Sequence, residues 1–318
     1  MKTLMKTSLY SRREILAGAA AAAAVSAQTS GERYTICAFS KHFQWTDVPG
    51  LSQLCKELGY EGVDLTVRSG GHVLPERAAE DLPKAAEAIR KAGLKFAMIT
   101  SDIVDVKTPH AETVIKTLKA LGVRYYRWGT FRYDLNKPLV PQLKEIKSRV
   151  QELAAMNQQY GVCAMYHTHS GIGYVGASMW DLYYLIESFS PDAVAVNYDV
   201  GHATVEGGYG GWIHSARLLM PHIRGVAVKD FLWKKNEKGM WVPGWCALGQ
   251  GMVNFPQFFK MLKAAGFAGP LQLHMEYDEL GGADKGRTSF TIPKEKLLAI
   301  MKRDIESLKR LLGQVGMA

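Results

Sequence analysis

Residues 56–67 read KELGYEGVDLTV, and this stretch predicts the fold because it joins the end of a helix, a glycine and the start of a strand. Glycine just past a helix suits a left-handed C-terminal cap before the chain enters the next strand. The same order recurs in four further stretches, which are RKAGLKF (90–96), KALGVRY (119–125), QQYGVCA (158–164) and KAAGFAG (263–269). The chain is therefore expected to repeat one helix-to-strand connection along its length.

Around these connections, short β-rich runs alternate with helical patterns. The expected strands are 34–39, 62–67, 95–100, 125–128, 162–166, 194–198, 223–228 and 271–274. The expected helices that follow them are 49–58, 82–92, 111–121, 141–160, 179–189, 212–220, 255–265 and 294–312. Alternating βα units imply a parallel sheet, and eight of them in about 285 residues match a (β/α)8 TIM barrel better than an open doubly wound sheet.

Composition agrees with a single globular domain. The chain has 318 residues, of which 47% are hydrophobic and 22% charged, enough for a large core. Without a linker or a low-complexity tract, residues 28–318 are expected to form one TIM-barrel domain. The cysteines show no paired spacing, so we expect mostly buried, reduced thiols and leave a disulfide open; they are Cys37, Cys55, Cys163 and Cys246.

The first 27 residues are typical of an export signal. They run from a basic start through Arg12-Arg13 and an alanine-rich segment to Val25-Ser26-Ala27, which resembles a twin-arginine signal with a small-residue cleavage site. A basic amphipathic helix is the alternative. The signal predicts a periplasmic or otherwise exported protein that starts near Gln28. Its apolar run is too short to span a bilayer, and no later segment is long enough, so no membrane span is expected.

The charge gives little support for a nucleic-acid partner. The formal net charge is +9, and the signal contributes three of these charges, because four basic side chains stand there against Glu14. The other basic residues are spread without a long basic block. A mildly basic surface of this kind is weak support for any polyanion partner.

Six of the nine histidines follow expected strand ends, where a TIM barrel carries its active site. They are His42, His72, His167, His169, His202 and His274. An isolated histidine at such a position is more often a local hydrogen bonder, but six at one rim point to a site. His167 and His169 are two apart and would face the same side of an extended strand. Together with Asp199 and Glu276, imidazoles suit Zn, Mn, Co or Fe.

Several motifs resemble the xylose isomerase-like TIM-barrel superfamily, which includes sugar phosphate isomerases and epimerases. They are GYEGVDLT (59–66), YHTH (166–169), DVGHA (199–203), VKD (228–230) and HMEY (274–277), and the similarity covers about residues 34–312. The resemblance implies one divalent metal bound at the strand ends. Asp199 and Glu276 match two family ligands, and His167 stands at the strand-five position. Ala227 replaces the strand-seven histidine, so His202 and His169 are the candidates to complete the set.

The resemblance implies an exported, divalent-metal-dependent sugar isomerase or epimerase that transfers a proton through a metal-stabilised enediolate. Glu276 is one candidate base. The family's second glutamate is missing, so its partner would be His167, His169, His72 or Lys229. The single-base pattern leaves a keto-sugar or cyclitol dehydratase (lyase) open, and Ala227 leaves a non-catalytic sugar-binding barrel open. An endonuclease IV-like nuclease would need a richer metal-binding set and is not expected.

The substrate is expected to be a small sugar or keto-sugar. Arg68, Trp128 and Trp245 are the candidate binding residues, with Arg132 as a further arginine in the strand-four loop. Trp245 belongs to WVPGWCALGQGMV (241–253), expected as a long aromatic loop that borders the substrate, since aromatic faces stack on sugars. The alternative is a hydrophobic loop that closes the barrel end. The sugar, the metal and a homo-oligomeric state are left open by the sequence.

Overall fold

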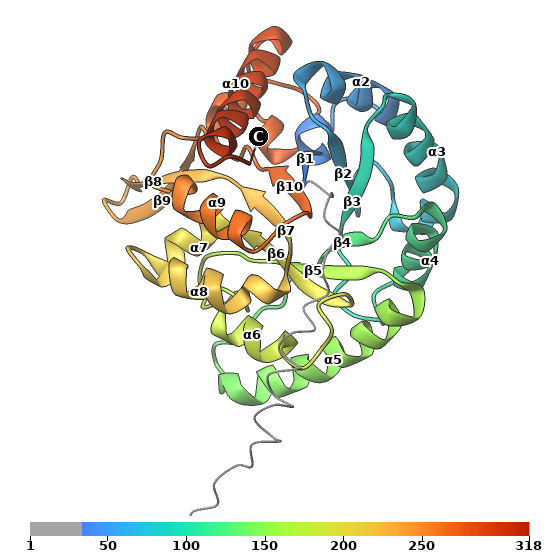
Figure 1. Ribbon diagram of the computed structural model, residues 1–318, viewed down its shortest axis with the longest axis vertical. Helices are drawn as coiled ribbons and strands as arrows, with labels where there is room; N and C mark the ends of the chain where they lie inside the picture. The colour runs from blue at the N-terminus through green and yellow to red at the C-terminus, as the bar shows by residue number, and fades with distance from the viewer. Residues whose placement is uncertain (1–33, 318) are drawn as a thin grey trace, which may run out of the picture. The chain divides into compact units, whose positions relative to one another are not determined.

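The computed structural model describes residues 34–317, and these form the predicted eight-stranded barrel (Figure 1). The strands pair in parallel and close in the order β1-β10-β7-β6-β5-β4-β3-β2. Their bounds are β1 Thr35–Phe39, β2 Gly62–Val67, β3 Lys95–Ser101, β4 Tyr125–Trp128, β5 Cys163–His167, β6 Val194–Asp199, β7 Ile223–Val228 and β10 Pro270–Leu273. The predicted signal, residues 1–27, lies outside the described residues.

Helices surround the barrel, as the strand–helix alternation predicts (Figure 1). They are α2 Val48–Leu58, α3 Ala78–Lys91, α4 Ala111–Leu121, α5 Leu139–Tyr160, α6 Trp180–Ile186, α7 Val200–Gly207, α8 Gly211–Leu219, α9 Phe255–Ala264 and α10 Lys294–Gly313. Short 3-10 turns cover Ser40–Phe43, Pro75–Arg77, Met220–His222, Asp278–Leu280 and Ala283–Lys285. Among residues 34–317, no helix combines the length and the hydropathy that a bilayer crossing requires.

The glycine that follows a helix closes it as the opening stretch predicts. Gly59 has φ 92°, and its N–H donates to the carbonyls of Cys55 and Lys56 at the end of α2. Gly161 caps α5 in the same left-handed conformation, with φ 67°. A residue with a Cβ adopts this conformation at a cost, so glycine at these positions turns the chain directly into the following strand.

Strand alternation divides the side chains between the barrel interior and the surrounding helices. At one level of the interior, Met98, Cys163, Met165 and Ala195 form a cluster separate from the main core. Further along the strands the interior becomes polar: Asn197 Nδ2 on β6 donates to Gln272 Oε1 on β10 at 2.7 Å, across the intervening β7. The carboxyl ends of the strands therefore surround buried polar groups.

The expected loop after β7 differs from the prediction, because much of it forms an antiparallel hairpin of β8 (Asp230–Lys235) and β9 (Trp241–Cys246). Phe231 and Trp245 pack together across this hairpin with ring centroids 6.0 Å apart. The Asp230 carboxylate then accepts the backbone N–H groups of Gly249, Gly251 and Val253, which orders the rest of the segment. The four cysteines are free, and three of them are buried.

Candidate functional site

The ammonium of Lys229 is the centre of a charged group at the carboxyl end of the barrel. Its Nζ is 2.8 Å from Glu276 Oε2, 2.7 Å from His202 Nε2 and 3.3 Å from Asp199 Oδ2, and it lies 4.3 Å from the ring centroid of Trp245. Burial lowers the pKa of Lys229, but the Asp199 and Glu276 carboxylates outweigh burial and raise it. The side chain is therefore a fixed cation at neutral pH.

Glu276 is held between two lysines. Lys41 Nζ donates to Oε1 at 2.8 Å, while Lys229 donates to Oε2. Burial would raise the pKa of Glu276, but Lys229 and Lys41 hold it well below its usual range. The carboxylate is ionised, and because its side chain is 26% exposed it remains open to a molecule entering the barrel mouth.

Beside this charged group, His167, Asp199 and His274 present three buried donor atoms within 4.8 Å of one another. His167 Nε2 is 3.6 Å from Asp199 Oδ2. The His274 ring stacks on Phe39, with centroids 4.5 Å apart, and lies 5.2 Å from the His167 ring. His167 ends β5, Asp199 ends β6 and His274 directly follows β10. These three strands thus bring together a compact set of nitrogen and oxygen atoms.

This donor set fits a divalent metal. Both ring nitrogens of His274 are buried and have no hydrogen-bond partner among residues 34–317, whereas Asp199 Oδ2 is buried with the Lys229 ammonium 3.3 Å away. Buried polar atoms without partners are costly, and a cation would satisfy them. Burial lowers the pKa of His167 and of His274 well below the usual range, so both rings are neutral and competent ligands. Two imidazoles and a carboxylate suit the predicted Zn, Mn, Co or Fe.

His169 and His202 lie next to this set, but their nitrogens already have partners. His202 Nε2 accepts from Lys229, and its Nδ1 is 2.7 Å from Ser170 Oγ. His169 Nε2 accepts from Arg127 Nη2 at 3.4 Å, and its Nδ1 is 3.1 Å from the His167 carbonyl oxygen. Burial lowers the pKa of His169 to about 3, so the ring is neutral. The structure thus gathers both histidines at the site, while His274 alone of these rings keeps both nitrogens without a partner among residues 34–317.

Two predicted site residues require correction. Trp128 is 1% exposed, and its Nε1–H donates to the Val104 carbonyl, because its position on β4 points it outward among the surrounding helices. It belongs to the core and does not line the barrel interior. His72 contacts Thr66 Oγ1 at 3.2 Å through Nδ1 and lines a separate cavity with Asp47. No contact joins His72 to Lys229 or Glu276 within the described part of the chain.

The other predicted binding residues lie at the barrel mouth or on its wall. Trp245 contacts Lys229 and packs edge-on against His202, with ring centroids 4.8 Å apart. Arg68 lines a small cavity together with Lys41. Arg132 instead stacks on Tyr174, with its guanidinium carbon 3.7 Å from the ring centroid.

Sequence reasoning missed Lys41 and Arg127 and left His274 out of the proposed ligands. Strand alternation could have indicated two of them. His274 shares its side with Glu276, two residues on, and Arg127 alternates with the outward Trp128. Lys41 lies in the turn after β1 and meets Glu276 across 235 residues of sequence, a contact with no local signal.

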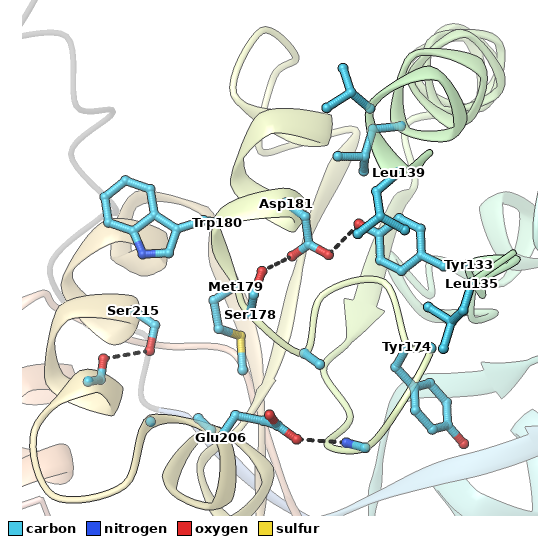
Figure 2. Close-up of a pocket in the computed structure, with 18 residues that line it drawn as sticks. Tyr133, Leu135, Leu139, Tyr174, Ser178, Met179, Trp180, Asp181, Glu206 and Ser215 are labelled. Carbon is cyan, nitrogen blue, oxygen red and sulfur yellow. Dashed lines mark hydrogen bonds between the residues drawn. The ribbon is translucent and has the colours of Figure 1, made fainter. Parts of the chain in front are cut away.

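A separate cavity of about 780 Å³, shown in Figure 2, is lined by none of the charged residues and histidines of the candidate site. It is bordered by the start of α5, the β5–α6 connection and the α7–α8 region. Its hydrogen bonds brace the wall: Tyr133 Oη donates to Asp181 at 2.7 Å, and the Gly171 N–H donates to Glu206 at 2.7 Å. The reactive groups therefore belong to the barrel interior and not to this cavity.

Three solved structures illustrate the likeness of the fold. A 3-keto-D-glucoside 4-epimerase from E. coli is 13% identical, with a TM-score of 0.62, and the match covers 88% of this chain and 100% of that one. An L-ribulose 3-epimerase is 14% identical (TM-score 0.63; 89% and 95% covered). The IOLI protein, solved with a zinc atom, is 16% identical (TM-score 0.62; 88% and 97% covered). No curated protein matches the chain by sequence comparison.

The sequence itself carries the family assignment. The family described as "Xylose isomerase-like TIM barrel" matches residues 52–311, which is most of the chain and runs from α2 into α10. The eight-stranded closed barrel agrees with that description. The chain belongs to the xylose isomerase-like TIM-barrel family.

Proposed function

We propose that the protein is a divalent-metal-dependent sugar isomerase or epimerase that moves a proton next to a carbonyl group. The observation that carries the proposal is the ionised Glu276, held by Lys229, beside the grouped donor atoms of His167, Asp199 and His274. Its location at the carboxyl ends of the strands supports the proposal, because TIM-barrel enzymes carry their chemistry there. The two epimerases with similar folds support it further.

His167, Asp199 and His274 would hold the ion. When bound, the ion would act as a Lewis acid on the carbonyl oxygen and the adjacent hydroxyl of the sugar. The three ligands would leave positions open for those oxygens. Trp245, beside Lys229, offers an aromatic face for the sugar ring.

Glu276 would accept the proton from the carbon next to the carbonyl. Two lysines keep it ionised, which makes it ready to accept a proton although it lowers its basicity. As the proton reaches Glu276, negative charge develops on the sugar oxygens, and the Lys229 ammonium lies where it can compensate that charge. One carboxylate can return the proton to the neighbouring carbon on the same face, which gives an isomerase. An epimerase needs a second group that delivers a proton to the opposite face. His169 is the candidate, and because its resting ring is neutral it would first take up that proton from solvent, while Glu276 returns its own to solvent.

Solvent exchange tests this proposal. The purified protein with Mn²⁺ would be incubated in D2O with D-fructose, D-tagatose, L-ribulose and a 3-keto-glucoside, and the sugars followed by proton NMR and mass spectrometry. Deuterium should enter at the carbon next to the carbonyl, and Glu276→Gln should abolish the exchange. Glu206→Gln is the matched control, because Glu206 is an exposed carboxylate that lines the separate cavity of about 780 Å³. This variant should leave the deuterium exchange unchanged.

The same experiment separates the alternatives. A keto-sugar or cyclitol dehydratase would release water and give an unsaturated product, whereas an isomerase or epimerase conserves the sugar's formula. Absence of exchange and of any product with the whole set, in the presence of Mn²⁺, would favour a non-catalytic sugar-binding barrel.

We also propose export through the twin-arginine pathway. The support is the order of features in residues 1–27, with Arg12-Arg13 ahead of the alanine-rich run. Replacing both arginines by lysine should leave the precursor in the cytoplasm, whereas the unchanged chain should reach the periplasm and lose its leader near Gln28. Equal periplasmic amounts of the two proteins would contradict the proposal.

A further inference from the structure

We infer that one face of the β8–β9 hairpin is a subsite for a second ring, so that the substrate is a glycoside, in which the reacting sugar is linked to another sugar or to an aromatic group. The inference rests on the proposed function, because it names the substrate class of that same site. A sugar ring and an aromatic ring can both stack on an indole, and the binding experiment separates them.

Strand pairing sorts the aromatic side chains of the hairpin onto one face. Directly paired residues of an antiparallel sheet point to the same side, and so does every second residue of a strand. The pairs on this face are Phe231 with Trp245, Trp233 with Pro243, and Lys235 with Trp241. They include all four aromatic side chains of β8 and β9. The opposite face has no aromatic residue, and its members are Asp230, Leu232, Lys234, Val242, Gly244 and Cys246.

At its base, the aromatic face borders the reactive group. The ring centroid of Trp245 is 4.3 Å from Lys229 Nζ and 4.8 Å from the ring centroid of His202. Phe231 is buried between two indoles, with its ring centroid 6.0 Å from that of Trp245 and 5.8 Å from that of Trp233. The aromatic surface is therefore continuous from the neighbourhood of Lys229 out to Trp233.

The outer part of the same face is open to solvent. Trp233 is 40% exposed and Trp241 is 64% exposed. Trp241 stands four residues from Trp245 along β9, which is about 13 Å in an extended strand. A single sugar ring held beside Lys229 and Trp245 would not reach that far. A ring linked to this sugar would lie over Trp233, and a longer chain would continue towards Trp241.

The exposed aromatic area suits a small ligand better than a second protein. One aromatic side chain buries about 150–250 Å² when it is fully covered, whereas a stable protein interface buries about 800 Å² on each partner. Two partly exposed indoles supply only a minor share of such an interface. Lys235 Nζ lies 5.5 Å from the ring centroid of Trp241, so a donor for hydroxyl groups stands beside a surface for stacking.

Both ends of the hairpin are fixed by hydrogen bonds. At the tip, Asn236 Oδ1 accepts the N–H groups of Lys238 and Met240, each at 3.0 Å. At the base, the Asp230 carboxylate accepts the Gly251 N–H at 2.8 Å. The tryptophans are thus presented on an ordered surface, which lowers the entropy cost of binding a ligand there.

Equilibrium binding tests the inference without requiring turnover. Isothermal titration of the full chain with excess Mn²⁺ would compare three sets that share a glycosyl group. One set is methyl β-glucoside, phenyl β-glucoside and cellobiose, and the second is methyl β-galactoside, phenyl β-galactoside and lactose. The third is methyl α-glucoside, phenyl α-glucoside and maltose. In at least one set, a ligand with the second ring should bind about three- to tenfold tighter than its methyl glycoside, as expected for one added stacking contact.

The variants assign this gain to the hairpin. Trp233→Ala and Trp241→Ala should each reduce the gain, and Trp241→Phe, which keeps an aromatic ring, should retain part of it. Trp180→Ala is the matched control, because this tryptophan is also exposed but begins α6 and lines the separate cavity; it should keep the full gain. A tighter phenyl glycoside would identify an aromatic aglycone, and a tighter disaccharide a second sugar. Either result supports the subsite.

Equal affinity within all three sets, or no detectable binding by any member, would overturn the inference. A gain that both alanine variants retain would overturn it too, as would a dimer in light scattering that these variants convert to a monomer, since the tryptophans would then bind a second copy. A gain without deuterium exchange would keep the subsite and reject the proposed reaction. Exchange on free sugars without any gain would do the reverse.

Discussion

Replacement of Lys229 by methionine should destabilise the fold strongly and in a pH-dependent manner. The substitution keeps an unbranched side chain but removes the ammonium that lies 2.8 Å from Glu276 and 3.3 Å from Asp199. Both carboxylates then lose their principal counter-charge at a buried position. Breaking a buried ion pair by removing one partner costs about 3–5 kcal/mol, and this is the loss expected in the free energy of unfolding at pH 8.

The sign of the pH dependence follows from Asp199. Burial already raises the pKa of Asp199 to about 6 in the presence of Lys229, and loss of the ammonium should raise it further. A raised carboxyl pKa costs stability above that pKa, and the cost is relieved as pH falls and the group takes up a proton. The difference in the free energy of unfolding between the variant and the unchanged protein should therefore shrink as the pH falls. The change is about 1.4 kcal/mol per pH unit, from the pKa of Asp199 in the variant down to pH 6.

Urea unfolding at pH 8, 7 and 6, with excess EDTA so that no metal replaces the ammonium, measures both quantities. Lys234→Met, on the exposed side of β8, is the matched control and should change stability by less than about 0.5 kcal/mol. Adding Asp199→Asn to Lys229→Met should recover part of the loss. A loss below about 1 kcal/mol, or one independent of pH, would refute the electrostatic account of this site.

Three further changes test the surroundings. Burial lowers the pKa of His42 to about 3 while its Nε2 accepts the Met275 N–H, so the neutral ring favours folding above pH 6.5 and that stability is lost as pH falls towards 3. Between pH 7 and pH 5, the free energy of unfolding should therefore fall by about 2 kcal/mol less in His42→Gln than in the unchanged chain, as measured by urea unfolding. An equal fall in the two proteins would contradict this. Trp128→Ala should lower the free energy of unfolding by about 3–5 kcal/mol because the indole is in the core, and a loss below about 1 kcal/mol would place it at the surface. Gly251→Ala would put a Cβ 2.1 Å from Asp230 Oδ1, so it should lower the melting temperature, and an unchanged melting temperature would show that the segment after β9 adapts freely.

The sequence indicates the barrel because its signals are local. Gly59 and Gly161 occur where a helix must stop, and their left-handed conformations in the structure follow from the absence of a Cβ. The hairpin of β8 and β9 was missed because residues 236–240 contain no two-residue turn signature, and its two strands lack a clear alternation of apolar and polar residues.

The site was predictable only where a residue follows a strand end. His167, Asp199, Lys229 and Glu276 could be identified in this way, and the structure brings them together. The side of the strand decides the other cases. Trp128 is next to Arg127 in sequence, but Trp128 faces the surrounding helices and Arg127 faces the barrel interior, where it contacts His169.

Contacts between distant segments carry no such signal. Lys41 holds Glu276 from the turn after β1, and Phe39 on β1 stacks on the ring of His274, which has no hydrogen-bond partner among residues 34–317. Both facts depend on β1 and β10 pairing to close the barrel, which no local sequence pattern specifies.

The central claim is that the carboxyl end of the barrel binds one divalent ion through His167, Asp199 and His274. Equilibrium dialysis of the metal-free protein against Mn²⁺ and Zn²⁺ tests it most directly, beside Asp199→Asn, His274→Ala and, as a control, His214→Ala on the exposed side of α8. The account predicts one ion per chain, retained in the control and bound at least about tenfold more weakly in the other two variants. An absence of binding, or binding that Asp199→Asn and His274→Ala leave unchanged, would contradict it.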